Sequence, residues 1–173
     1  MKHLNKAAIL ASVVAVATPA MADDWTGFYI GAHGGYGEVS GGGADNSDFL
    51  GGVQAGYNYD FGGWVLGAEV DYSFDNRSFG ASTMDDTWSL KGKVGYAFND
   101  TMVYGTVGGV RGGIASGGTT TYDNGYIYGV GVEQRLASNW SVAGEILQTR
   151  FDSFGGGADV KDTKAVLKVN YRF

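Results

Sequence analysis

After residue 25 the chain alternates between apolar and polar positions, which is the period of a β-strand and not of a helix. The segment 64–74 shows the alternation clearly, because every second residue is apolar or aromatic: Trp64, Leu66, Ala68, Val70, Tyr72 and Phe74. The intervening residues are smaller or polar, and include Gly67, Glu69, Asp71 and Ser73. The same pattern predicts eight strands, at residues 26–38, 49–61, 64–75, 87–98, 101–111, 124–136, 139–151 and 163–173.

The connections between these segments alternate in length. Gly62-Gly63, Asn99-Asp100 and Ala137-Ser138 suit tight hairpin turns. The other four connections are longer, polar and rich in glycine, at residues 39–48, 76–86, 112–123 and 152–162. An open antiparallel sheet would leave two unpaired edges. We therefore expect an all-β fold in which eight antiparallel strands close into an up-and-down β-barrel.

Barrel size decides which face points inward, because eight strands enclose an interior only just wide enough for side chains. The aromatic face is too bulky for that interior; it carries Phe28, Tyr36, Tyr57, Tyr59, Phe61, Trp64, Tyr72, Phe74, Trp88, Tyr96, Phe98, Tyr104, Tyr126, Tyr128 and Trp140. The opposite face is dominated by glycine, at Gly31, Gly35, Gly56, Gly67, Gly95, Gly105, Gly109, Gly129 and Gly131. The sequence therefore predicts an aromatic exterior in lipid and an interior lined with glycine.

Aromatic residues also gather near the ends of the predicted strands, whereas the middles carry smaller residues such as Ala32, Val53, Leu66, Thr106 and Val130. Two aromatic girdles around an aliphatic band are typical of outer-membrane barrels, so we expect a transmembrane β-barrel. The alternatives are a soluble barrel with its apolar face inside and a sandwich with these aromatic residues in its core. The sandwich does not account for the clustering of large residues at strand ends.

The amino-acid composition excludes several other classes of protein. The 173 residues include 31 glycines and no cysteine, and the net charge is −6. The lack of cysteine excludes a disulfide scaffold and a cysteine zinc site. The acidic balance argues against a nucleic-acid partner.

Residues 1–22 have the layout of a secretory signal peptide, with Lys2 and Lys6 before an apolar run and a small-x-small pattern at Ala20 and Ala22. The apolar run is too short for a spanning helix, which needs about 20 residues. We expect cleavage after Ala22 and a single barrel domain at residues 23–173.

Several motifs resemble one bacterial family. The segments Trp25-Thr26-Gly27-Phe28-Tyr29-Ile30-Gly31 and Gly52-Val53-Gln54-Ala55-Gly56-Tyr57-Asn58 are similar to alphaproteobacterial outer-membrane β-barrel proteins, the porin-family or opacity-like group. So are Gly67-Ala68-Glu69-Val70-Asp71-Tyr72, Gly129-Val130-Gly131-Val132-Glu133, Asn139-Trp140-Ser141 and the ending Val169-Asn170-Tyr171-Arg172-Phe173. More distantly, the plan resembles OmpX and the OmpA transmembrane domain. The resemblance implies an integral outer-membrane protein of Gram-negative bacteria with both termini in the periplasm.

The last predicted strand ends on an alternating set of apolar residues, Leu167, Val169, Tyr171 and Phe173. This set is similar to the assembly signal that the outer-membrane insertion machinery recognises. The alternative is an ordinary last strand. We expect the insertion machinery, membrane lipid and lipopolysaccharide to be partners of the protein.

Alternation projects ten charged residues into the interior: Glu69, Asp71, Lys91, Lys93, Arg111, Glu133, Arg135, Glu145, Lys168 and Arg172. Buried charges are costly unless they are paired, so we expect an ion-pair network that fills the bore. The alternative is a gated pathway for ions. Open porins have about 16–18 strands, which argues against a wide channel here.

The sequence offers little for catalysis or cofactor binding. His33 is the single histidine after residue 22, and neither a Walker loop nor G-x-G-x-x-G is present. We expect no catalytic residue, cofactor or metal, and a structural and surface-interaction role through residues 39–48, 76–86, 112–123 and 152–162. A narrow channel and, less favoured, a lipid-modifying enzyme remain as alternatives.

Overall fold

The computed structural model describes residues 25–41, 44–74, 77–79, 82–116, 119–137, 139–151 and 160–173. These residues form nine β-strands: β1 (Gly27–Gly41), β2 (Ala44–Asp60), β3 (Trp64–Phe74), β4 (Arg77–Phe79), β5 (Ser82–Phe98), β6 (Thr101–Ser116), β7 (Thr119–Ala137), β8 (Trp140–Phe151) and β9 (Val160–Arg172). None of the described residues builds a helix long and apolar enough to cross a membrane. The predicted signal peptide, including Ala20 and Ala22, lies outside the described residues.

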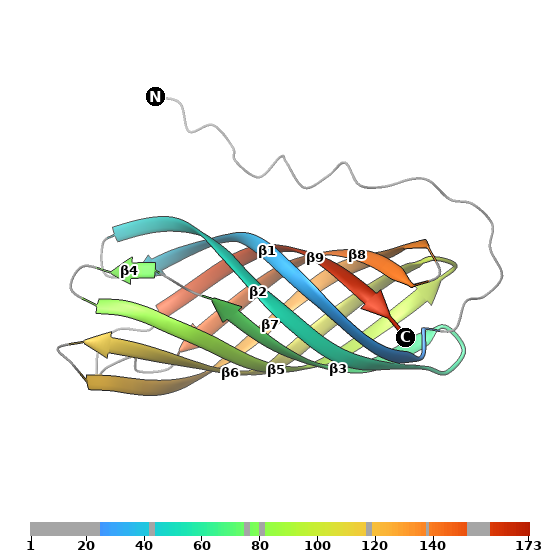
Figure 1. Ribbon diagram of the computed structural model, residues 1–173, viewed down its shortest axis with the longest axis horizontal. Coiled ribbons are helices and arrows are strands. Elements are labelled where there is room, and N and C mark those ends of the chain that lie inside the picture. The colour runs from blue at the N-terminus through green and yellow to red at the C-terminus, as the bar shows by residue number, and fades with distance from the viewer. Residues whose placement is uncertain are drawn as a thin grey trace, which may run out of the picture.

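Eight of the strands close into a barrel. Strands β1, β2 and β3 are neighbours, and β5 to β9 follow one another in chain order. Two further antiparallel pairings complete the ring, β3 with β5 and β1 with β9. The prediction of a closed eight-stranded antiparallel barrel is confirmed. In Figure 1 the tight turns and the C-terminus lie at one end of the barrel, and the longer hairpins lie at the other end.

The strands extend further than the sequence predicted. Strands β1 and β2 remain paired as far as Gly41 and Ala44, and β6 and β7 remain paired as far as Ser116 and Thr119. The prediction of loops over 39–48 and 112–123 was therefore wrong in extent, because polar, glycine-rich residues there continue the backbone ladder. Strand β4, inside the predicted connection 76–86, pairs with β5 beyond the point where the β3–β5 pairing ends. Residues 152–159 of the fourth connection lie outside the described residues.

Two tight turns use backbone conformations that favour glycine or asparagine. Gly62 and Gly63 have φ of 93° and 90°, and Asn99 has φ of 54°. The Asp60 side chain accepts hydrogen bonds from the N–H groups of Gly62 and Gly63 at 3.0 and 2.9 Å. These local contacts fix the register of the β2–β3 hairpin at its short end.

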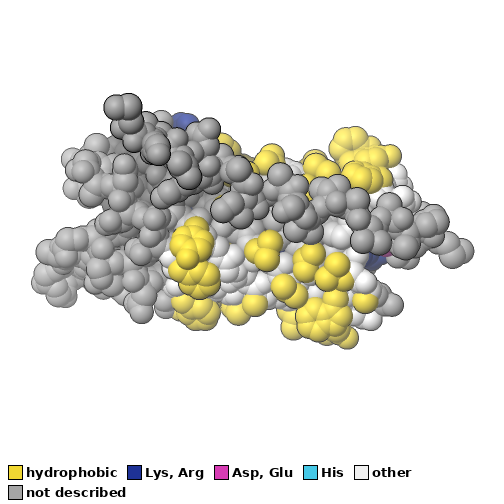
Figure 2. Space-filling view, turned by 90° about the horizontal axis from the view of Figure 1, so that it is seen from above, with side chains coloured by type: hydrophobic (Ala, Val, Ile, Leu, Met, Phe, Trp, Pro, Cys, Tyr) yellow, Lys and Arg dark blue, Asp and Glu magenta, His cyan; other side chains and the backbone are white. Residues whose placement is uncertain are grey.

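The wall of the barrel is apolar outside and polar inside. On β3, Glu69 is 1% exposed and the adjacent Val70 is 40% exposed. Large apolar side chains gather toward two levels of the wall, with smaller ones between them (Figure 2). Ring pairs mark both levels: Trp64–Tyr96 and Trp140–Tyr171 near the tight turns, and Tyr36–Phe49 and Tyr72–Trp88 toward the long hairpins. An apolar exterior of this kind belongs in lipid, not in water.

Strand β6 has the opposite facing to the one predicted. Tyr104 and Thr106 are buried inside the barrel, whereas Gly105 and Gly109 lie on the outer side. The reason is packing against glycine, since a Cβ on Gly131 of β7 would lie 2.5 Å from Cζ of Tyr104. The ring of Tyr104 therefore fills the space that the missing side chain leaves. Both faces of segment 101–111 are apolar over most of their length. Alternation alone therefore does not show which face points into the barrel.

Candidate functional site

Charged side chains from four strands meet in the middle of the barrel. Glu69 and Asp71 come from β3, Lys91 from β5, Glu145 from β8 and Lys168 from β9, and all five are buried. We refer to these five residues as the central cluster. Three carboxylates and two ammonium groups thus share one enclosed space.

The distances within the central cluster are those of direct ion pairs. The Nζ atom of Lys91 lies 2.8 Å from Oε1 of Glu69 and 3.1 Å from Oδ2 of Asp71. The Nζ atom of Lys168 lies 2.6 Å from Oε1 of Glu69 and 2.9 Å from Oε2 of Glu145. Glu69 and Lys91 are opposite each other in the β3–β5 register, whereas Lys168 reaches Glu69 across the interior. The cluster therefore bridges the bore and does not merely line one wall.

A second layer lies next to the central cluster, around Lys93. Its Nζ atom lies 4.5 Å from the centroid of the Tyr104 ring and 5.0 Å from that of the Tyr29 ring. The hydroxyl of Tyr29 donates to Glu69 at 2.9 Å, and that of Tyr104 donates to Glu145 at 2.7 Å. The two tyrosines thereby connect this layer to the central cluster.

The barrel end with the tight turns is closed by Trp25. This side chain is fully buried, and its ring lies 4.8 Å from Cζ of Arg135 and 4.9 Å from Cζ of Arg172. Its indole N–H donates to the carbonyl of Asn99 at 3.4 Å, and its backbone N–H donates to Asp60 at 3.3 Å. The segment before β1 thus turns into the mouth of the barrel and fills it.

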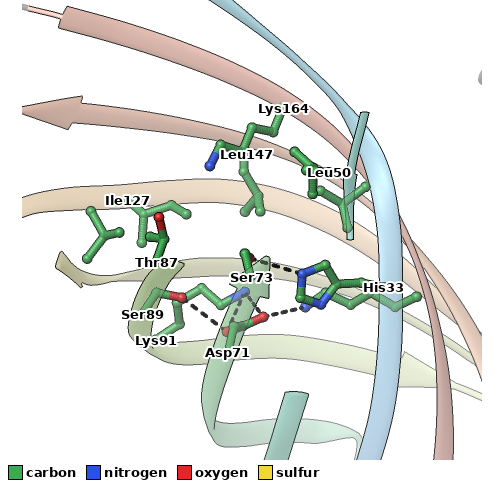
Figure 3. Close-up of a pocket in the computed structure, with 13 residues that line it drawn as sticks. His33, Leu50, Asp71, Ser73, Thr87, Ser89, Lys91, Ile127, Leu147 and Lys164 are labelled. Carbon is green, nitrogen blue, oxygen red and sulfur yellow. Dashed lines mark hydrogen bonds and ion pairs between the residues drawn. The ribbon is translucent and has the colours of Figure 1, made fainter. Parts of the chain in front are cut away.

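On the other side of the central cluster lies a small polar cavity of about 30 Å³ (Figure 3). Its lining includes Asp71, Lys91 and His33, whose ring nitrogens contact Gln54 at 2.8 Å and Ser73 at 3.2 Å. A cavity needs roughly 10–15 Å³ to hold one water molecule, so this space suits about two. A group of buried apolar residues lines the same cavity and narrows the bore there: Leu50, Ile127, Leu147 and Val166.

The structure places the predicted interior residues inside the barrel, with the exception of Arg111. Besides the central cluster, Lys93, Glu133, Arg135 and Arg172 contact other interior groups. Arg111 lies on the outer side of β6 and is exposed, so its assignment to the interior was wrong for the same reason as that of Tyr104.

Sequence reasoning missed several uncharged interior residues. Gln54 and Asn170 hydrogen bond to each other at 2.8 Å, and Asn170 donates to Glu133 at 3.2 Å. Tyr29 alternates with Gly31, and Gln54 with Gly56, on the face that was assigned to the interior. Applying the alternation to every residue, and not only to charged ones, would have found them.

The predicted assembly residues lie on the outside of β9. Leu167, Val169 and Phe173 are exposed, and the ring of Tyr171 lies 5.2 Å from that of Trp140. The backbone N–H of Phe173 donates to the carbonyl of Phe28 at 3.0 Å. The four side chains are therefore presented together on one apolar strip.

Little in the described part of the barrel suits metal chemistry. No group of three or more His, Cys, Asp or Glu side chains is arranged there to hold a metal ion. The carboxylates of the central cluster are paired with lysines, which occupy the positions that a metal ion would need.

Comparison with known proteins gives the family. Residues 8–173 match the family model described as "Outer membrane protein beta-barrel domain". A 22 kDa outer membrane protein of Rhizobium leguminosarum is 34% identical over 169 residues, which cover 87% of this chain and 80% of that protein. A 31 kDa outer-membrane immunogenic protein of Brucella melitensis is 32% identical over 229 aligned positions, covering 96% and 95%.

Solved structures share the fold at low sequence identity. Neisserial surface protein A has a TM-score of 0.65 at 14% identity, over 86% of this chain and 98% of that one. Ail, the attachment invasion locus protein of Yersinia pestis, has a TM-score of 0.63 at 19% identity, over 86% and 99%. With its apolar exterior, its filled interior and these relatives, the chain belongs to the outer-membrane β-barrel family and is a protein of the bacterial outer membrane.

Proposed function

We propose that the protein is a non-conducting surface protein, in which the barrel anchors long hairpins that contact other molecules outside the cell. The observation that carries the proposal is the filled interior. The central cluster bridges the bore, Trp25 fills one mouth, and Leu50, Ile127, Leu147 and Val166 narrow the other half. A barrel whose described interior is blocked at these three levels serves as an anchor and not as a pore.

The orientation follows from the lengths of the connections. Outer-membrane barrels have short periplasmic turns and longer extracellular loops. The tight turns after β2, β5 and β7 would therefore face the periplasm, and the β1–β2 and β6–β7 hairpins would face the exterior. Hairpins that stay paired well beyond the apolar band present their tips away from the membrane surface.

The charges in the long connections restrict which ligands these connections can bind. Residues 39–48, 76–86, 112–123 and 152–162 contain eight acidic residues, of which Asp162 is buried beside Lys164, and two basic ones, Arg77 and Lys161. Ail of Yersinia pestis has been solved with the heparin analogue sucrose octasulfate. An acidic surface would repel such a polyanion, so we propose partners with basic surfaces, including host proteins, for the present chain.

The orientation is tested with epitope tags at Ala44, Ser82, Gly117 and Gly156, and with a matched tag at Asn99. Exposed polar tips accept insertions, so all five proteins should fold. The four hairpin tags should be detected on intact cells, and the Asn99 tag should be detected only after permeabilisation. The opposite result would invert the barrel and remove the surface role.

A narrow channel is the second candidate, because polar side chains, among them His33 and Asp71, line part of the interior cavity. Conductance across planar bilayers separates the two functions. The native barrel should give no discrete conductance steps at neutral pH. Regular steps that persist when the protein is diluted would identify a channel.

The surface role itself is tested in strains that lack one hairpin tip at a time. Adhesion to host cells, survival in serum and envelope integrity should be scored beside a strain that lacks the whole protein. Loss of adhesion or serum survival with an intact envelope supports a surface contact. We also propose that the protein is not an enzyme, so lipid A mass profiles should be identical with and without it.

A further inference from the structure

Two arginines lie on the outward face of the barrel wall, among the residues whose side chains the structure describes. Arg111 projects from β6 and Arg150 from β8, and the other outward strand positions whose exposure is described are apolar, glycine or uncharged polar. A cation on the lipid-facing wall is costly near the middle of the membrane and becomes tolerable only near its surfaces. Their position along the barrel therefore decides what they contact.

Both arginines lie at the same height. Arg111 is eleven residues after Asp100, and Arg150 is eleven residues after Asn139, each counted from a tight turn. At about 3.3 Å per residue and a strand tilt of about 40°, eleven residues rise roughly 28 Å along the barrel axis. The apolar band of such barrels is about 25 Å tall. The two guanidinium groups thus belong at the far edge of the band, beside the long hairpins.

The two arginines also lie close to each other around the barrel, with β7 between them. In the register, Arg150 is opposite Tyr126, and Tyr126 is opposite Gly109, two residues from Arg111. The two Cα atoms are separated by two inter-strand spacings and by two residues along the strand, which gives a distance of about 12 Å. A Cβ on Gly109 would contact nothing within 4 Å, so open space lies between the two side chains.

Arg150 is held in place by its neighbours. It interacts with the hydroxyl groups of Tyr126 and Tyr128, and its Cζ atom lies 6.0 Å from the centre of the Tyr128 ring. The hydroxyl of Tyr128 in turn donates to Gln148. A guanidinium carries five N–H donors, more than two hydroxyl groups can accept, so the positioned Arg150 side chain keeps donor capacity for an acceptor from outside the protein.

Toward the middle of the membrane, the wall below the arginines is apolar. Leu90, Val107, Val130 and Ile146, from four adjacent strands, are 61%, 64%, 62% and 50% exposed. A ligand that satisfies both surfaces has an anionic head and long apolar chains. A free phosphate ion would use only the arginines and would leave the apolar surface uncovered.

We propose that Arg111 and Arg150 bind the anionic headgroup of a lipid in the outer leaflet, and that its acyl chains cover Leu90, Val107, Val130 and Ile146. Arginine forms bidentate, charge-assisted hydrogen bonds with phosphate and carboxylate oxygens, which suits the phosphorylated sugars of lipid A. Tyr126 and Trp88 flank the headgroup in the aromatic girdle. The choice of leaflet rests on the proposed orientation, whereas the recognition of the headgroup does not.

The test uses the refolded protein in nanodiscs of zwitterionic phospholipid, with diphosphoryl lipid A titrated in and bound lipid counted by native mass spectrometry. The double variant Arg111→Gln/Arg150→Gln should bind at least about tenfold more weakly, because charge-assisted hydrogen bonds contribute more than the equivalent of a tenfold change in affinity. The matched control, Arg111→Lys/Arg150→Lys, keeps both charges and should retain a large part of the affinity. The shift of the folded barrel on unheated gels verifies that each variant is folded.

Three results would overturn the proposal. The first is unchanged affinity of the glutamine double variant for lipid A. The second is equal binding of dephosphorylated lipid A and diphosphoryl lipid A. The third is displacement of the lipid by millimolar inorganic phosphate, which would mean that the site holds a free anion. If binding passes all three tests but the epitope tags invert the barrel, the proposed orientation fails and the headgroup belongs to the inner leaflet.

Discussion

Arg172 donates a hydrogen bond from Nη2 to the backbone carbonyl of Trp25 at 2.5 Å, while its guanidinium lies 4.9 Å from the Trp25 ring. The two residues are 147 positions apart in the sequence. Trp25 precedes the first strand and Arg172 ends the last strand. This contact therefore joins the two ends of the chain beside the β1–β9 pairing, at the barrel end with the tight turns. Arg135 lies against the same ring from β7.

Replacing Trp25 should therefore destabilise the barrel. We expect Trp25→Ala to lower the free energy of unfolding by about 3–5 kcal/mol, the usual cost of truncating a buried tryptophan. The matched control is Trp64→Ala at the same end, because Trp64 lies outside and is 53% exposed. Denaturant unfolding in lipid vesicles measures both. Equal losses in the two variants would show that Trp25 has no special role in closing the mouth.

The central cluster should be sensitive to the loss of one charge. Glu69→Gln removes the carboxylate that both Lys91 and Lys168 contact, and should cost about 3–5 kcal/mol because each buried lysine loses its shortest ion pair. In a double-mutant cycle with Lys168→Gln, the second change should recover part of that loss, with a coupling of about 0.5–3 kcal/mol. Strict additivity would mean that the two side chains do not interact.

Tyr104 and Gly131 should depend on each other. Gly131→Ala places a methyl group against the Tyr104 ring, whereas Gly109→Ala on the outer wall meets nothing within 4 Å. We expect the first variant to lose about 1–3 kcal/mol, as overpacked interiors do, and the second to remain within about 0.5 kcal/mol of the native protein. Adding Tyr104→Leu to Gly131→Ala should relieve the clash. No difference between the two glycine variants would argue against the observed facing of β6.

The facing of β6 can also be read from labelling. A cysteine at Val107 should react with lipid-phase probes, as should cysteines at Val53, Leu66 and Val130, and all four should resist bulky water-soluble thiol reagents. A cysteine at Thr106 should resist both classes of reagent, because this side chain is buried in the interior. Lipid-phase labelling at 106 together with protection at 107 would show that Thr106 faces lipid, as the sequence predicted.

The strip of Leu167, Val169, Tyr171 and Phe173 predicts an assembly defect. Phe173→Ser should leave export intact and reduce the amount of folded barrel in the outer membrane. Val103→Ser, a change on the same outer wall far from the strip, serves as the control. Separation of folded and unfolded forms on unheated gels gives the measurement. Normal insertion of Phe173→Ser would leave Phe173 with a packing role only.

The strands and the sides of most of them could be predicted from the sequence, because alternation is a local property. On β3, for instance, Glu69 and Val70 take the sides that their polarity indicates. On β6, Tyr104 broke the rule that aromatic residues face lipid, since a glycine on the next strand made room for it inside. The ion pairs were beyond sequence reasoning. Lys168 reaches Glu69, 99 residues away, only because of the stagger of the closed sheet, and no local pattern records that stagger.

The position of Lys168 on the last strand has a consequence for the order of assembly. Until β9 docks, Glu69, Asp71 and Glu145 lack the ammonium group that later contacts all three of them. A barrel that stalls at this stage holds a surplus of negative charge in a space that is losing its water. That surplus opposes closure of the seam by any other segment and rewards closure by β9, which carries both Lys168 and Arg172. We therefore expect the interior charges to favour β9 as the strand that completes the barrel.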